Sequence, residues 1–417
     1  MESIRGIKGT KDILGDETPL WQFIEKTIHQ FMQSYGYEEI RTPKFENSAL
    51  FNRSIGINTD IVSKEMYSWI DQGNNKLTLK PEVTASVVRA YIQHNLGRQK
   101  QLNKLYYIDS LFRRERPQKG RFRQFEQFGI ESIGSEYPEQ DAEIISMAYF
   151  FYKELGVKNI TLKINSIGSK ESRNDYKKAL KNYFTPYLNK LTSTSKIRLD
   201  ENPLRILDTK VDFEKEIIKG APKIIDFLSS EDKKHFNKVL SYLESLEIKY
   251  EIDPYLVRGL DYYCKTVFEI QSNLLGSQSA LCGGGRYDYL IEELGGVSTP
   301  AIGFAAGIER LILALDKEKI NLDITPDIYM VTLGEEAMSY GLSIASTLRK
   351  KLGFIVVSDM LQKNMKPQLK EANKINSDYV IIIGDNEIIN KEVLIKNMVQ
   401  GEQEKVSLDK IVSYFKK

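Results

Sequence analysis

Two segments that alternate apolar and polar residues, separated by a strongly charged stretch, constrain the fold of this chain most. The segments KLYYIDSLFRRE (residues 104–115) and FRQFEQFGIESI (residues 122–133) flank the polar sequence RPQKGR. Alternation with a period of two places successive side chains on opposite faces of a strand. Two such strands joined by a polar loop form an antiparallel hairpin. We therefore predict a hairpin over residues 104–133 with a long cationic loop at its tip.

The length of the chain exceeds what one hydrophobic core usually supports. Its 417 residues are enough for two or three domains of roughly 100–200 residues each. No window approaches the ~20 apolar residues that cross a membrane, and the N-terminal segment MESIRGIKGTKDIL lacks the layout of a secretory signal. We therefore predict a cytoplasmic protein without a membrane partner.

The cysteine content and the net charge set few further limits on the class of protein. The two cysteines, Cys264 and Cys282, have neither CxxC spacing nor a histidine at metal-ligand spacing. We therefore predict neither a disulfide framework nor a metal site built by the protein. A formal net charge of +2 neither supports nor excludes a nucleic-acid partner, since local patches decide such binding.

Hydrophobic periodicity divides the chain into regions of different character. Apolar residues at three- and four-residue spacing predict amphipathic helices over residues 20–35 and 81–94, with a short strand over residues 38–41. Lysine-rich helical segments predominate over residues 168–246. From about residue 326, short apolar strands alternate with helical segments, which indicates a small α/β domain with a partly parallel sheet.

These regions predict an α+β protein in four parts. Residues 1–167 and 247–322 form the first and second parts of a core, and residues 168–246 are a mainly helical insertion between them. Residues 326–417 form the C-terminal α/β domain. The second part of the core includes GGGRYD and AIGFAAGIERLILAL, of which the latter passes from extended chain into a helix.

The charged hairpin loop is the first candidate site. Six arginines or lysines fall between Arg113 and Arg123, with Glu115 among them. Residues two apart share one face of a strand, so Arg113 would grip a phosphate while Glu115 accepts from an amine. The alternative interpretation is a solvated hairpin tip, where charge runs usually lie.

Four further stretches carry candidate residues. In VRGLDYYCKTVFE (residues 257–269), Arg258 and Asp261 interrupt the alternation of a buried strand. Glu82 in LKPEVTA begins the second predicted helix, where the macrodipole alone favours a glutamate. The glycines of LCGGGRYDYL allow close approach of a ligand but also build tight turns and bulges, and they match neither usual nucleotide motif. Arg310 in GFAAGIERL suits a surface position by pattern alone.

Together these ordered motifs resemble those of the histidyl-tRNA synthetases, a family of class II aminoacyl-tRNA synthetases. The strand followed by ERPQKGRFRQF is similar to the second class II signature and GFAAGIERL to the third. RGLDYY with TVFE, and then GGGRYD, resemble the two signatures peculiar to the histidyl family. The resemblance extends from RGIKGTKDIL to VLIKNMVQGEQ, and four ordered motifs are far more specific than any one of them.

The resemblance implies a class II antiparallel catalytic sheet flanked by helices, a homodimer and a C-terminal anticodon-binding domain. It also implies a reaction in which L-histidine and ATP, with Mg²⁺ accompanying the nucleotide, give histidyl-adenylate and pyrophosphate. The histidyl group then passes to the terminal ribose of tRNA(His).

The resemblance also assigns roles in catalysis and ATP binding. Arg258 and Arg113 are the implied catalytic residues, with Arg258 beside the α-phosphate and the substrate carboxylate. A rigidly held guanidinium there would stabilise the charge that develops during attack. The implied ATP contacts are Arg113 at the α-phosphate, Glu115 at the adenine amine and Arg310 at the γ-phosphate.

Histidine and tRNA contacts follow from the same resemblance. The implied histidine-binding residues are Glu82, Thr84, Gln127, Glu131, Arg258, Tyr262 and Tyr263. Of these, Glu131 and Tyr263 would serve the two imidazole nitrogens, and Glu82 would receive the α-ammonium group. The loop residues expected at the tRNA acceptor end are Arg116, Gln118, Lys119 and Arg121.

The chain departs from the family at one substrate loop. It has KPEVTA where the family usually has RPEGTA, with Lys80 replacing arginine and Val83 replacing glycine. Val83 adds a branched side chain beside the loop and could alter its backbone.

Two other functions remain open at this point. One is a histidine-sensing regulatory subunit of an ATP phosphoribosyltransferase, and the other is an inactive module that only binds tRNA. Such regulatory proteins typically lack the C-terminal domain and the ATP-binding arginines. This chain has that domain together with Arg113, Arg258 and Arg310.

Overall fold

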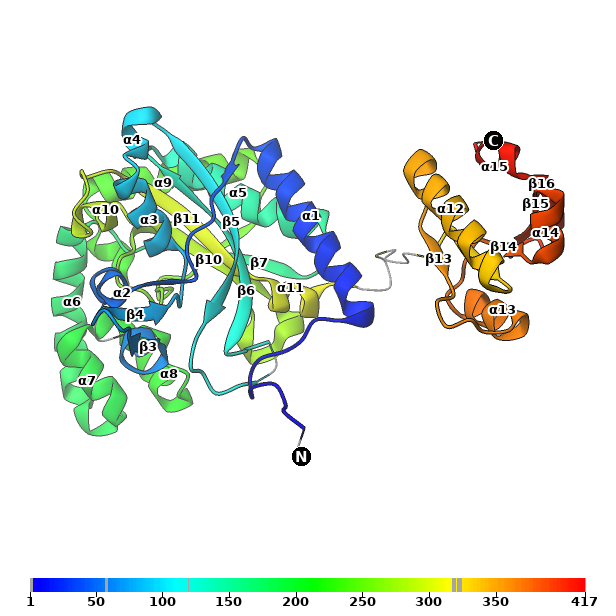
Figure 1. Ribbon diagram of the computed structural model, residues 1–417. Helices are drawn as coiled ribbons and strands as arrows, with labels where there is room; N and C mark the ends of the chain where they lie inside the picture. Colours follow the sequence, from blue (N-terminus) through cyan, green and yellow to red (C-terminus); the bar gives the residue numbers. More distant parts are fainter. Residues whose placement is uncertain (1–2, 57–58, 119, 317–319, 321–324, 417) are drawn as a thin grey trace. The chain divides into compact units, whose positions relative to one another are not determined.

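A computed structural model describes residues 3–56, 59–118, 120–316, 320 and 325–416 (Figure 1). The chain divides into two compact units, Met1–Ile320 and Asn321–Lys417. The predicted boundary at residue 322 lies outside the described residues. The larger unit contains every motif to which we assigned a catalytic or substrate-binding role.

An eight-stranded sheet forms the centre of the larger unit (Figure 1). Its strands, in order across the sheet, are β1 (Glu38–Glu39), β5 (Asn103–Phe112), β6 (Gln124–Ile133), β11 (Ala301–Gly307), β10 (Ala280–Arg286), β9 (Cys264–Ser272), β7 (Ile160–Ser166) and β8 (Tyr250–Ile252). Neighbours from β5 to β7 are antiparallel, whereas the edge pairs β1–β5 and β7–β8 are parallel. The largely antiparallel sheet confirms the predicted fold class.

The predicted hairpin is confirmed, because β5 pairs with β6 along its whole length. β5 ends at Phe112, however, so the prediction that Arg113 and Glu115 share one face of a strand is wrong. The backbone N–H of Arg114 donates to the carbonyl of Glu65, a residue outside the sheet, at 2.8 Å. This contact ties the start of the loop to a neighbouring segment, and the strand geometry is not continued.

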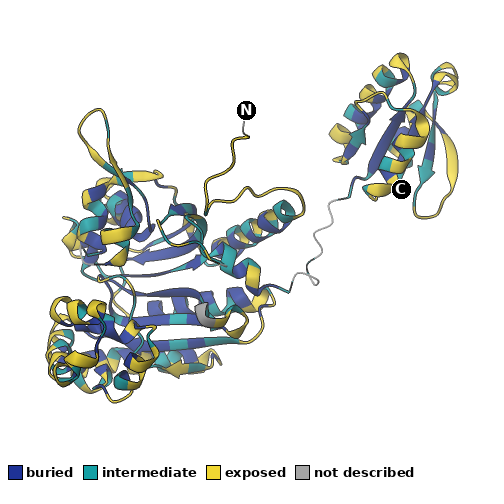
Figure 2. Cartoon of the chain, turned by 90° about the horizontal axis from the view of Figure 1, so that it is seen from below, coloured by how far each residue is buried: buried dark blue, intermediate teal, exposed yellow. Residues whose placement is uncertain are grey.

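Two long helices pack close to this sheet. The predicted helix over residues 20–35 is α1 (Thr18–Ser34), and it contacts α5 (Pro138–Glu154) through Phe31 and Phe151, whose ring centroids are 5.3 Å apart. α5 in turn packs against β9, β10 and β11. The buried strands and the exposed outer faces of the helices are distinct in Figure 2. These helices bury one face of the central strands.

The second predicted helix begins later than the sequence pattern indicates. It is α3 (Thr84–Gln93), so the prediction that Glu82 lies in its first turn is wrong. Glu82 precedes the helix and accepts the backbone N–H of Ala85 through Oε1 at 2.9 Å. The Glu82 carboxylate thus lies outside the helix and accepts an N–H of the first turn that has no partner within the helix.

Shorter elements complete the larger unit. A second sheet contains β2 (Phe45–Asn47), β4 (Lys76–Leu79) and β3 (Tyr67–Ile70) in that order. The short helical segments are η1 (Gly15–Glu17), α2 (Ser48–Ser54), the π-helical turn η2 (Ile61–Glu65), α4 (Leu96–Gln99), η6 (Asn273–Gln278), α10 (Leu290–Glu293) and α11 (Ile308–Ala314).

The chain between β7 and β8 is helical. It contains α6 (Lys170–Phe184), η3 (Thr185–Lys190), α7 (Ser193–Glu201), η4 (Pro203–Asp208), α8 (Asp212–Ile218), η5 (Ile224–Phe227) and α9 (Ser230–Ser245). The buried side chains Tyr176, Leu180 and Phe184 of α6 pack with apolar residues of the shorter helices. α9 packs against α5. We call residues 168–246 the helical insertion, with limits that remain a prediction.

The smaller unit has a mixed sheet, as predicted. Its strands are β13 (Val356–Ser358), β12 (Ile328–Thr332), β14 (Tyr379–Ile383), β15 (Glu392–Asn397) and β16 (Gln403–Ser407), in that order. The first three are parallel and the last two are antiparallel to their neighbours. The helical elements are α12 (Glu335–Leu352), α13 (Met365–Lys374), α14 (Asp385–Asn390), η8 (Leu408–Lys410) and α15 (Ile411–Tyr414).

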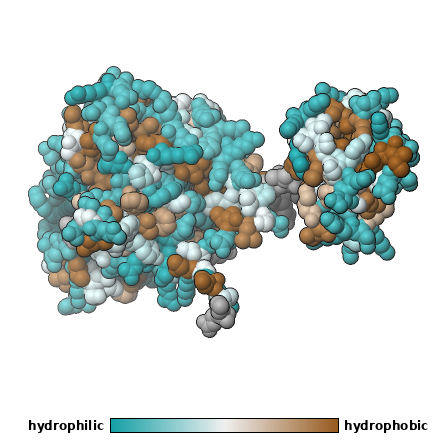
Figure 3. All heavy atoms as spheres, in the orientation of Figure 1, coloured by the Kyte–Doolittle hydropathy of each residue, from teal (hydrophilic) through white to brown (hydrophobic). Residues whose placement is uncertain are grey.

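The surface is mostly polar where it can be seen. On the face shown in Figure 3, hydrophilic residues predominate and hydrophobic residues appear in scattered patches. Exposed apolar side chains include Ile4, Ile7 and Leu14 in the N-terminal segment. Within the described ranges, no helix has the length and apolar character needed to cross a membrane.

A buried ion pair links the central strand β10 to α5. The side chains of Arg286 and Asp141 are both 0% exposed. Arg286 Nε donates to Asp141 Oδ1 at 2.7 Å, and its other nitrogens donate to the carbonyls of Ser135 and Tyr137 at 2.9 Å each. Burial alone would raise the pKa of Asp141, but the adjacent Arg286 lowers it, so the carboxylate stays charged.

We expect Arg286→Met to destabilise the larger unit by about 3–5 kcal/mol, because it leaves a buried carboxylate without its main partner. Urea unfolding followed by tryptophan fluorescence measures this, since both tryptophans, Trp21 and Trp69, lie in the larger unit. Lys178→Met, which removes an exposed pair with Asp175, is the control and is expected to cost about 0–1 kcal/mol. Equal losses in the two variants would contradict this prediction.

Candidate active site

A cavity of about 250 Å³ lies in the larger unit. Its walls come from β6, β10, β11, the hairpin loop, the start of α11 and the segments that precede α3 and β9. The predicted site residues that line it are Glu82, Thr84, Arg113, Glu115, Arg121, Gln127, Arg258, Tyr262, Tyr263 and Arg310. Glu131, Arg116 and Gln118 are not among its lining residues, and Lys119 lies outside the described residues.

The glycine run of β10 makes room for Arg258. A Cβ at Gly283 would lie 2.0 Å from Arg258 Nη2, and a Cβ at Gly284 would lie 2.2 Å from the carbonyl oxygen of Gly303 on β11. Such distances are far inside van der Waals contact. The run has both expected properties, because the strand register shifts between Gly285 and Arg286, and a group approaches closely at Gly283, where that group is a guanidinium of the chain itself.

Arg258 is held by the carboxylate of Glu269 on β9. Its Nη1 donates to Glu269 Oε2 at 2.6 Å, and Gln271 Nε2 donates to the other oxygen of Glu269 at 2.6 Å. Burial disfavours the charge of Arg258, but Glu269 outweighs this effect and raises its pKa. The guanidinium is therefore a fixed cation at the wall of the cavity.

Glu82 supplies a negative charge to the same cavity. It is 4% exposed, and burial raises its pKa, although hydrogen bonds from Ala85 and Thr84 oppose this shift. Its Oε1 accepts the Ala85 N–H, whereas Oε2 is buried and accepts no hydrogen bond within the described part of the chain. An unsatisfied buried carboxylate oxygen in a cavity is costly unless a ligand donates to it. This oxygen suits an ammonium group.

Glu131 lies in a buried hydrogen-bond network beside the cavity. It is 1% exposed, and its Oε1 accepts the hydroxyl of Thr84 at 2.7 Å, while its Oε2 accepts the hydroxyl of Tyr287. The Tyr107 hydroxyl also donates to Oε1 at 3.4 Å. A Cβ at position 303 would lie 2.0 Å from Oε2, so Gly303 is required there.

The guanidinium groups of Arg113, Arg121 and Arg310 line one part of the cavity, which we call the cationic end. Arg113 Nε donates to the carbonyl of Pro81 at 2.9 Å, and Arg310 Nη1 donates to the carbonyl of Ala280 at 2.9 Å. Burial lowers the pKa of Arg310, and the charges of Arg121 and Arg113 lower it further. Mutual repulsion of this kind is relieved by an anion, and arginine suits phosphate oxygens.

The hairpin loop places a carboxylate beside this cationic end. Glu115 forms an ion pair with Arg121 at 3.0 Å. Backbone hydrogen bonds join Gln118 and Arg121 in both directions, at 3.2 and 2.9 Å. Arg116 and Gln118 are exposed, so this part of the loop faces away from the cavity and is open to a large partner.

The two departures from the family sequence do not remove a group from the cavity. Lys80 is buried, pairs with Asp109 and donates to Thr42 Oγ1 at 3.0 Å. Val83 lines the cavity with a φ of −106°, an angle that any residue adopts. A glycine is therefore not required at this position.

The sequence analysis did not identify the residues that hold Arg258 and Glu131 in place. Glu269 fixes Arg258, and Tyr287 donates to Glu131, yet neither was assigned a role. Both lie inside quoted motifs, TVFE and GGGRYD. Motif membership was the available signal, but the pairing of each residue depends on which strands are neighbours.

An antiparallel sheet with a pocket of this charge pattern, followed by a separate mixed α/β unit, has the architecture of the class II aminoacyl-tRNA synthetases. Comparison with known proteins agrees. The family model for histidyl-tRNA synthetase matches residues 9–311, and the model for the anticodon binding domain matches residues 327–417.

Individual relatives cover the chain almost completely. A histidine–tRNA ligase of Staphylococcus aureus (strain JH9) is 47% identical over 416 residues, which are 98% of this chain and 99% of that protein. The crystal structure of apo S. aureus histidyl-tRNA synthetase matches with a TM-score of 0.85 and 40% identity over 100% of both chains. The chain belongs to the histidyl-tRNA synthetase family.

A more distant structure shows the fold alone. It is described as an ATP phosphoribosyltransferase regulatory subunit/histidyl-tRNA synthetase from Bacillus halodurans C. Its TM-score is 0.66 at 23% identity, and the match covers 89% of this chain and 97% of that one. This distant match does not by itself distinguish an enzyme from a regulatory protein, but the 47% identity to a histidine–tRNA ligase over nearly the whole chain does, and it supports aminoacylation.

The environment of Glu131 predicts a pH-dependent stability. Burial raises its pKa from 4.5 to about 8, against the opposing hydrogen bonds from Tyr287 and Thr84. Over the range between these two values, the folded protein keeps a proton that the unfolded chain has lost, so this carboxyl destabilises the fold increasingly as pH rises. Glu131→Gln removes the effect.

We expect the urea midpoint of Glu131→Gln, relative to that of the unsubstituted protein, to rise between about pH 5 and about pH 8. Urea titrations at several pH values across this window measure the difference. A difference that stays constant with pH would show that the Glu131 carboxyl does not titrate within this range.

Proposed function

We propose that this cavity joins L-histidine to ATP, and that the protein then transfers the histidyl group to the 3′ end of tRNA(His). The observation that carries the proposal is the charge pattern of one cavity. The unsatisfied oxygen of Glu82 suits an amine, and Arg113, Arg258 and Arg310 suit a carboxylate and phosphates. An amino acid and a nucleoside triphosphate need these opposite charges in one place.

The first step forms the adenylate. A carboxylate oxygen of histidine forms a bond to the α-phosphorus of ATP, and the bond from that phosphorus to the bridging oxygen breaks, releasing pyrophosphate. Negative charge builds at the α-phosphate during this exchange. Arg258, fixed by Glu269, and Arg113, fixed by the Pro81 carbonyl, supply preorganised donors for that charge. Alignment of the two bound substrates supplies the rest of the acceleration.

The second step uses the same cavity. A hydroxyl of the terminal ribose of tRNA attacks the carbonyl carbon of the adenylate, AMP leaves with the electron pair of the broken carbon–oxygen bond, and the hydroxyl proton is released. Arg116, Gln118, Lys119 and Arg121 are the proposed contacts of the tRNA acceptor end. Support comes from the exposure of Arg116 and Gln118 on the hairpin loop beside the cavity.

Different residues of the cationic end are proposed to contact different groups of ATP. We assign Arg310 to the γ-phosphate and Glu115 to the adenine amine, and both line the cavity. Mg²⁺ would enter with the nucleotide and reduce its charge. The Glu309 carboxylate lines the cavity next to Arg310, and it is the kind of oxygen ligand that Mg²⁺ takes alongside phosphate.

Histidine recognition rests on a second group of residues. Glu131 and Tyr263 are proposed for the imidazole nitrogens, with Thr84, Gln127 and Tyr262 around the rest of the substrate. The oxygens of Glu131 already accept hydroxyl groups, but the ionised carboxylate offers about four acceptor sites, and an N–H donated by the bound imidazole would favour that ionised form by lowering the pKa of Glu131. A further N–H from imidazole therefore has a place. Such a matched polar pair rejects substrates that leave it unpaired.

Three features of the proposal come from the family resemblance rather than from the cavity. They are the homodimer, the cytoplasmic location and the recognition of the anticodon by the C-terminal unit. The regulatory alternative is disfavoured because the matched anticodon-binding region is present and the arginines proposed for ATP are in place.

Pyrophosphate exchange tests the activation step. We expect histidine, and no other amino acid, to drive exchange of labelled pyrophosphate into ATP without tRNA. Arg258→Ala is expected to lower the exchange rate by roughly a hundredfold or more, since it removes a preorganised donor. Arg98→Ala, an exposed change on α4, is the control. Folded protein that binds histidine without any exchange would favour the regulatory alternative.

The role of Glu82 is tested with a substrate analogue. Glu82→Gln is expected to weaken histidine binding by roughly tenfold to a hundredfold, because it replaces a charged acceptor of the α-ammonium group. Binding of imidazolepropionate, which lacks that amine, is expected to change little, and calorimetric titration measures both. Equal weakening for the two ligands would show that Glu82 does not recognise the amine.

A further inference from the structure

Three of the residues proposed for catalysis and histidine recognition lie on a segment without regular structure. Residues 253–263 join β8 to β9, and this segment contains neither helix nor strand. It carries Arg258, Tyr262 and Tyr263, which line the cavity. We call residues 253–263 the arginine loop. Groups outside the loop must fix its position.

Asp261 of the arginine loop does not line the active-site cavity. Its side chain contacts the helical insertion. Asn202 Nδ2 donates to Asp261 Oδ1 at 3.0 Å, and Arg205 Nε donates to the same oxygen at 3.2 Å. Arg205 Nη2 lies 3.1 Å from Asp261 Oδ2. Arg205 thus joins Asp261 by one hydrogen bond to Oδ1 and one ion-pair contact to Oδ2.

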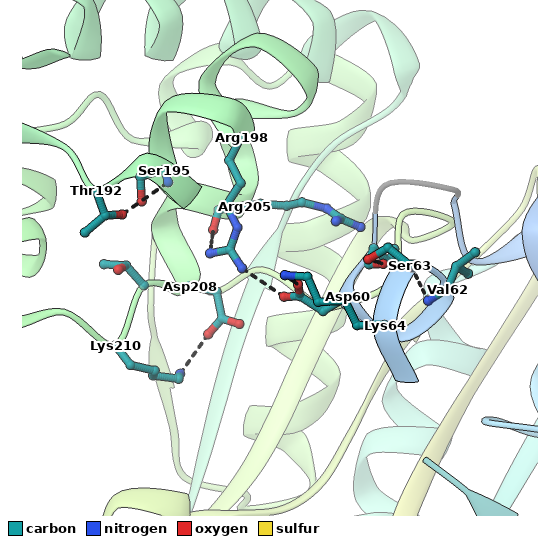
Figure 4. A network of polar contacts seen from close by, with 12 residues as sticks. Asp60, Val62, Ser63, Lys64, Thr192, Ser195, Arg198, Arg205, Asp208 and Lys210 are labelled. Carbon is teal, nitrogen blue, oxygen red and sulfur yellow. Dashed lines mark hydrogen bonds and ion pairs between the residues drawn. The ribbon is translucent and has the colours of Figure 1, made fainter. Parts of the chain in front are cut away.

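Two more arginines of the insertion contact segments around the active site. Arg173 on α6 donates from Nη1 to the carbonyl of Tyr263. Arg198 on α7 donates from Nη2 to Asp60 at 3.2 Å, and from Nη1 to the carbonyl of Arg205 at 3.3 Å. Figure 4 shows Arg198 reaching Asp60 beside Arg205. The insertion thus contacts the arginine loop at both Asp261 and Tyr263.

The part of the insertion that bears these arginines is itself braced by a buried carboxylate. Glu214 is 1% exposed and accepts the backbone N–H of Thr192 at 2.8 Å. It also accepts the hydroxyls of Ser195 at 2.9 Å and Thr209 at 2.5 Å. These contacts fix both ends of the segment that holds Arg198 and Arg205.

Packing between the insertion and the arginine loop is incomplete around Asp261. A second cavity, of about 350 Å³, lies between the insertion and the arginine loop, and Arg173, Lys177, Arg205, Arg258 and Asp261 are among its lining residues. Val257 packs against the apolar core of the insertion, but Asp261 is exposed. The contacts of Asp261 therefore cross a space that side chains do not fill, whereas Tyr262 and Tyr263 at the end of the loop are buried in the core of the larger unit.

We propose that Arg205 is a positioning residue for histidine activation. Its two-point contact with Asp261 sets the place of Arg258 and Tyr263, so docking of the helical insertion determines how fast the adenylate forms. The inference rests on the proposed roles of Arg258 and Tyr263. It assigns the insertion a role in the first step, before any tRNA is bound.

Kinetics of pyrophosphate exchange provide the first test. Arg205→Ala is expected to lower kcat by roughly tenfold to a hundredfold, as for a small displacement of a reacting group. The KM for ATP is expected to stay unchanged, because Arg113, Glu115 and Arg310 lie on other elements. Lys181→Ala, which removes an exposed ion pair with Asp200 in the same insertion, is the control and should retain full activity.

A double-variant cycle separates positioning from general damage. If Arg205 acts through Asp261, the losses in Arg205→Ala and Asp261→Ala should be similar, and combining them should cost no more than either alone. The swapped pair Arg205→Asp with Asp261→Arg should recover part of the rate. Unchanged kcat in Arg205→Ala, or fully additive losses, would overturn the inference.

Amide hydrogen exchange tests the inference without any activity. Residues 253–263 should exchange faster in Arg205→Ala than in the unsubstituted protein or in Lys181→Ala. Unchanged exchange of this loop would overturn the positioning role, whatever the kinetics. Absence of histidine-dependent activity in the unsubstituted protein would instead overturn the proposed function, so the two failures are distinguishable.

Discussion

The glycine run of the central strand β10 lets a charged side chain lie directly against the sheet, in a place that the side chains of β10 would ordinarily fill. Gly283 leaves the space that the Arg258 guanidinium occupies, and Gly284 permits contact with β11 that a Cβ would block. Glu269 on the neighbouring strand β9 then neutralises and orients that cation. Each of these groups depends on the order of β9, β10 and β11 in the sheet. The antiparallel order of the sheet thus builds the cavity wall.

The second organising property of the site is the presence of both signs of charge in one cavity. Glu82 lies just before α3, whereas Arg113, Arg121 and Arg310 lie on the hairpin loop and α11 together with the carboxylates Glu115 and Glu309. Burial perturbs both sets, raising the pKa of Glu82 and lowering that of Arg310. Groups held away from their preferred ionisation mark a site prepared for charged ligands. A zwitterionic substrate and a polyanion together would pair with both the carboxylates and the guanidinium groups.

Sequence patterns predicted the hairpin, the helices and the mixed C-terminal sheet, because hydrophobic periodicity reports local geometry directly. They failed at element ends. Glu82 lies before its helix, and Arg113 and Glu115 lie beyond their strand, since tertiary hydrogen bonds decide where these elements stop. The supporting groups Glu269 and Tyr287 were also out of reach. Their roles depend on strand neighbours that only the folded sheet defines, whereas the motifs located the site residues that touch the cavity.

The helical insertion limits which deletions the larger unit can tolerate. β7 and β8 are parallel neighbours at the edge of the sheet, and the insertion is the connection between them. Parallel strands cannot be joined by a tight turn and need a crossover of a dozen or more residues. α9, which packs against α5, provides the returning part of that crossover. Deletions compatible with the sheet are therefore confined to the region of α6 to α8, and a chain shortened to a direct β7–β8 turn would lose its edge strand.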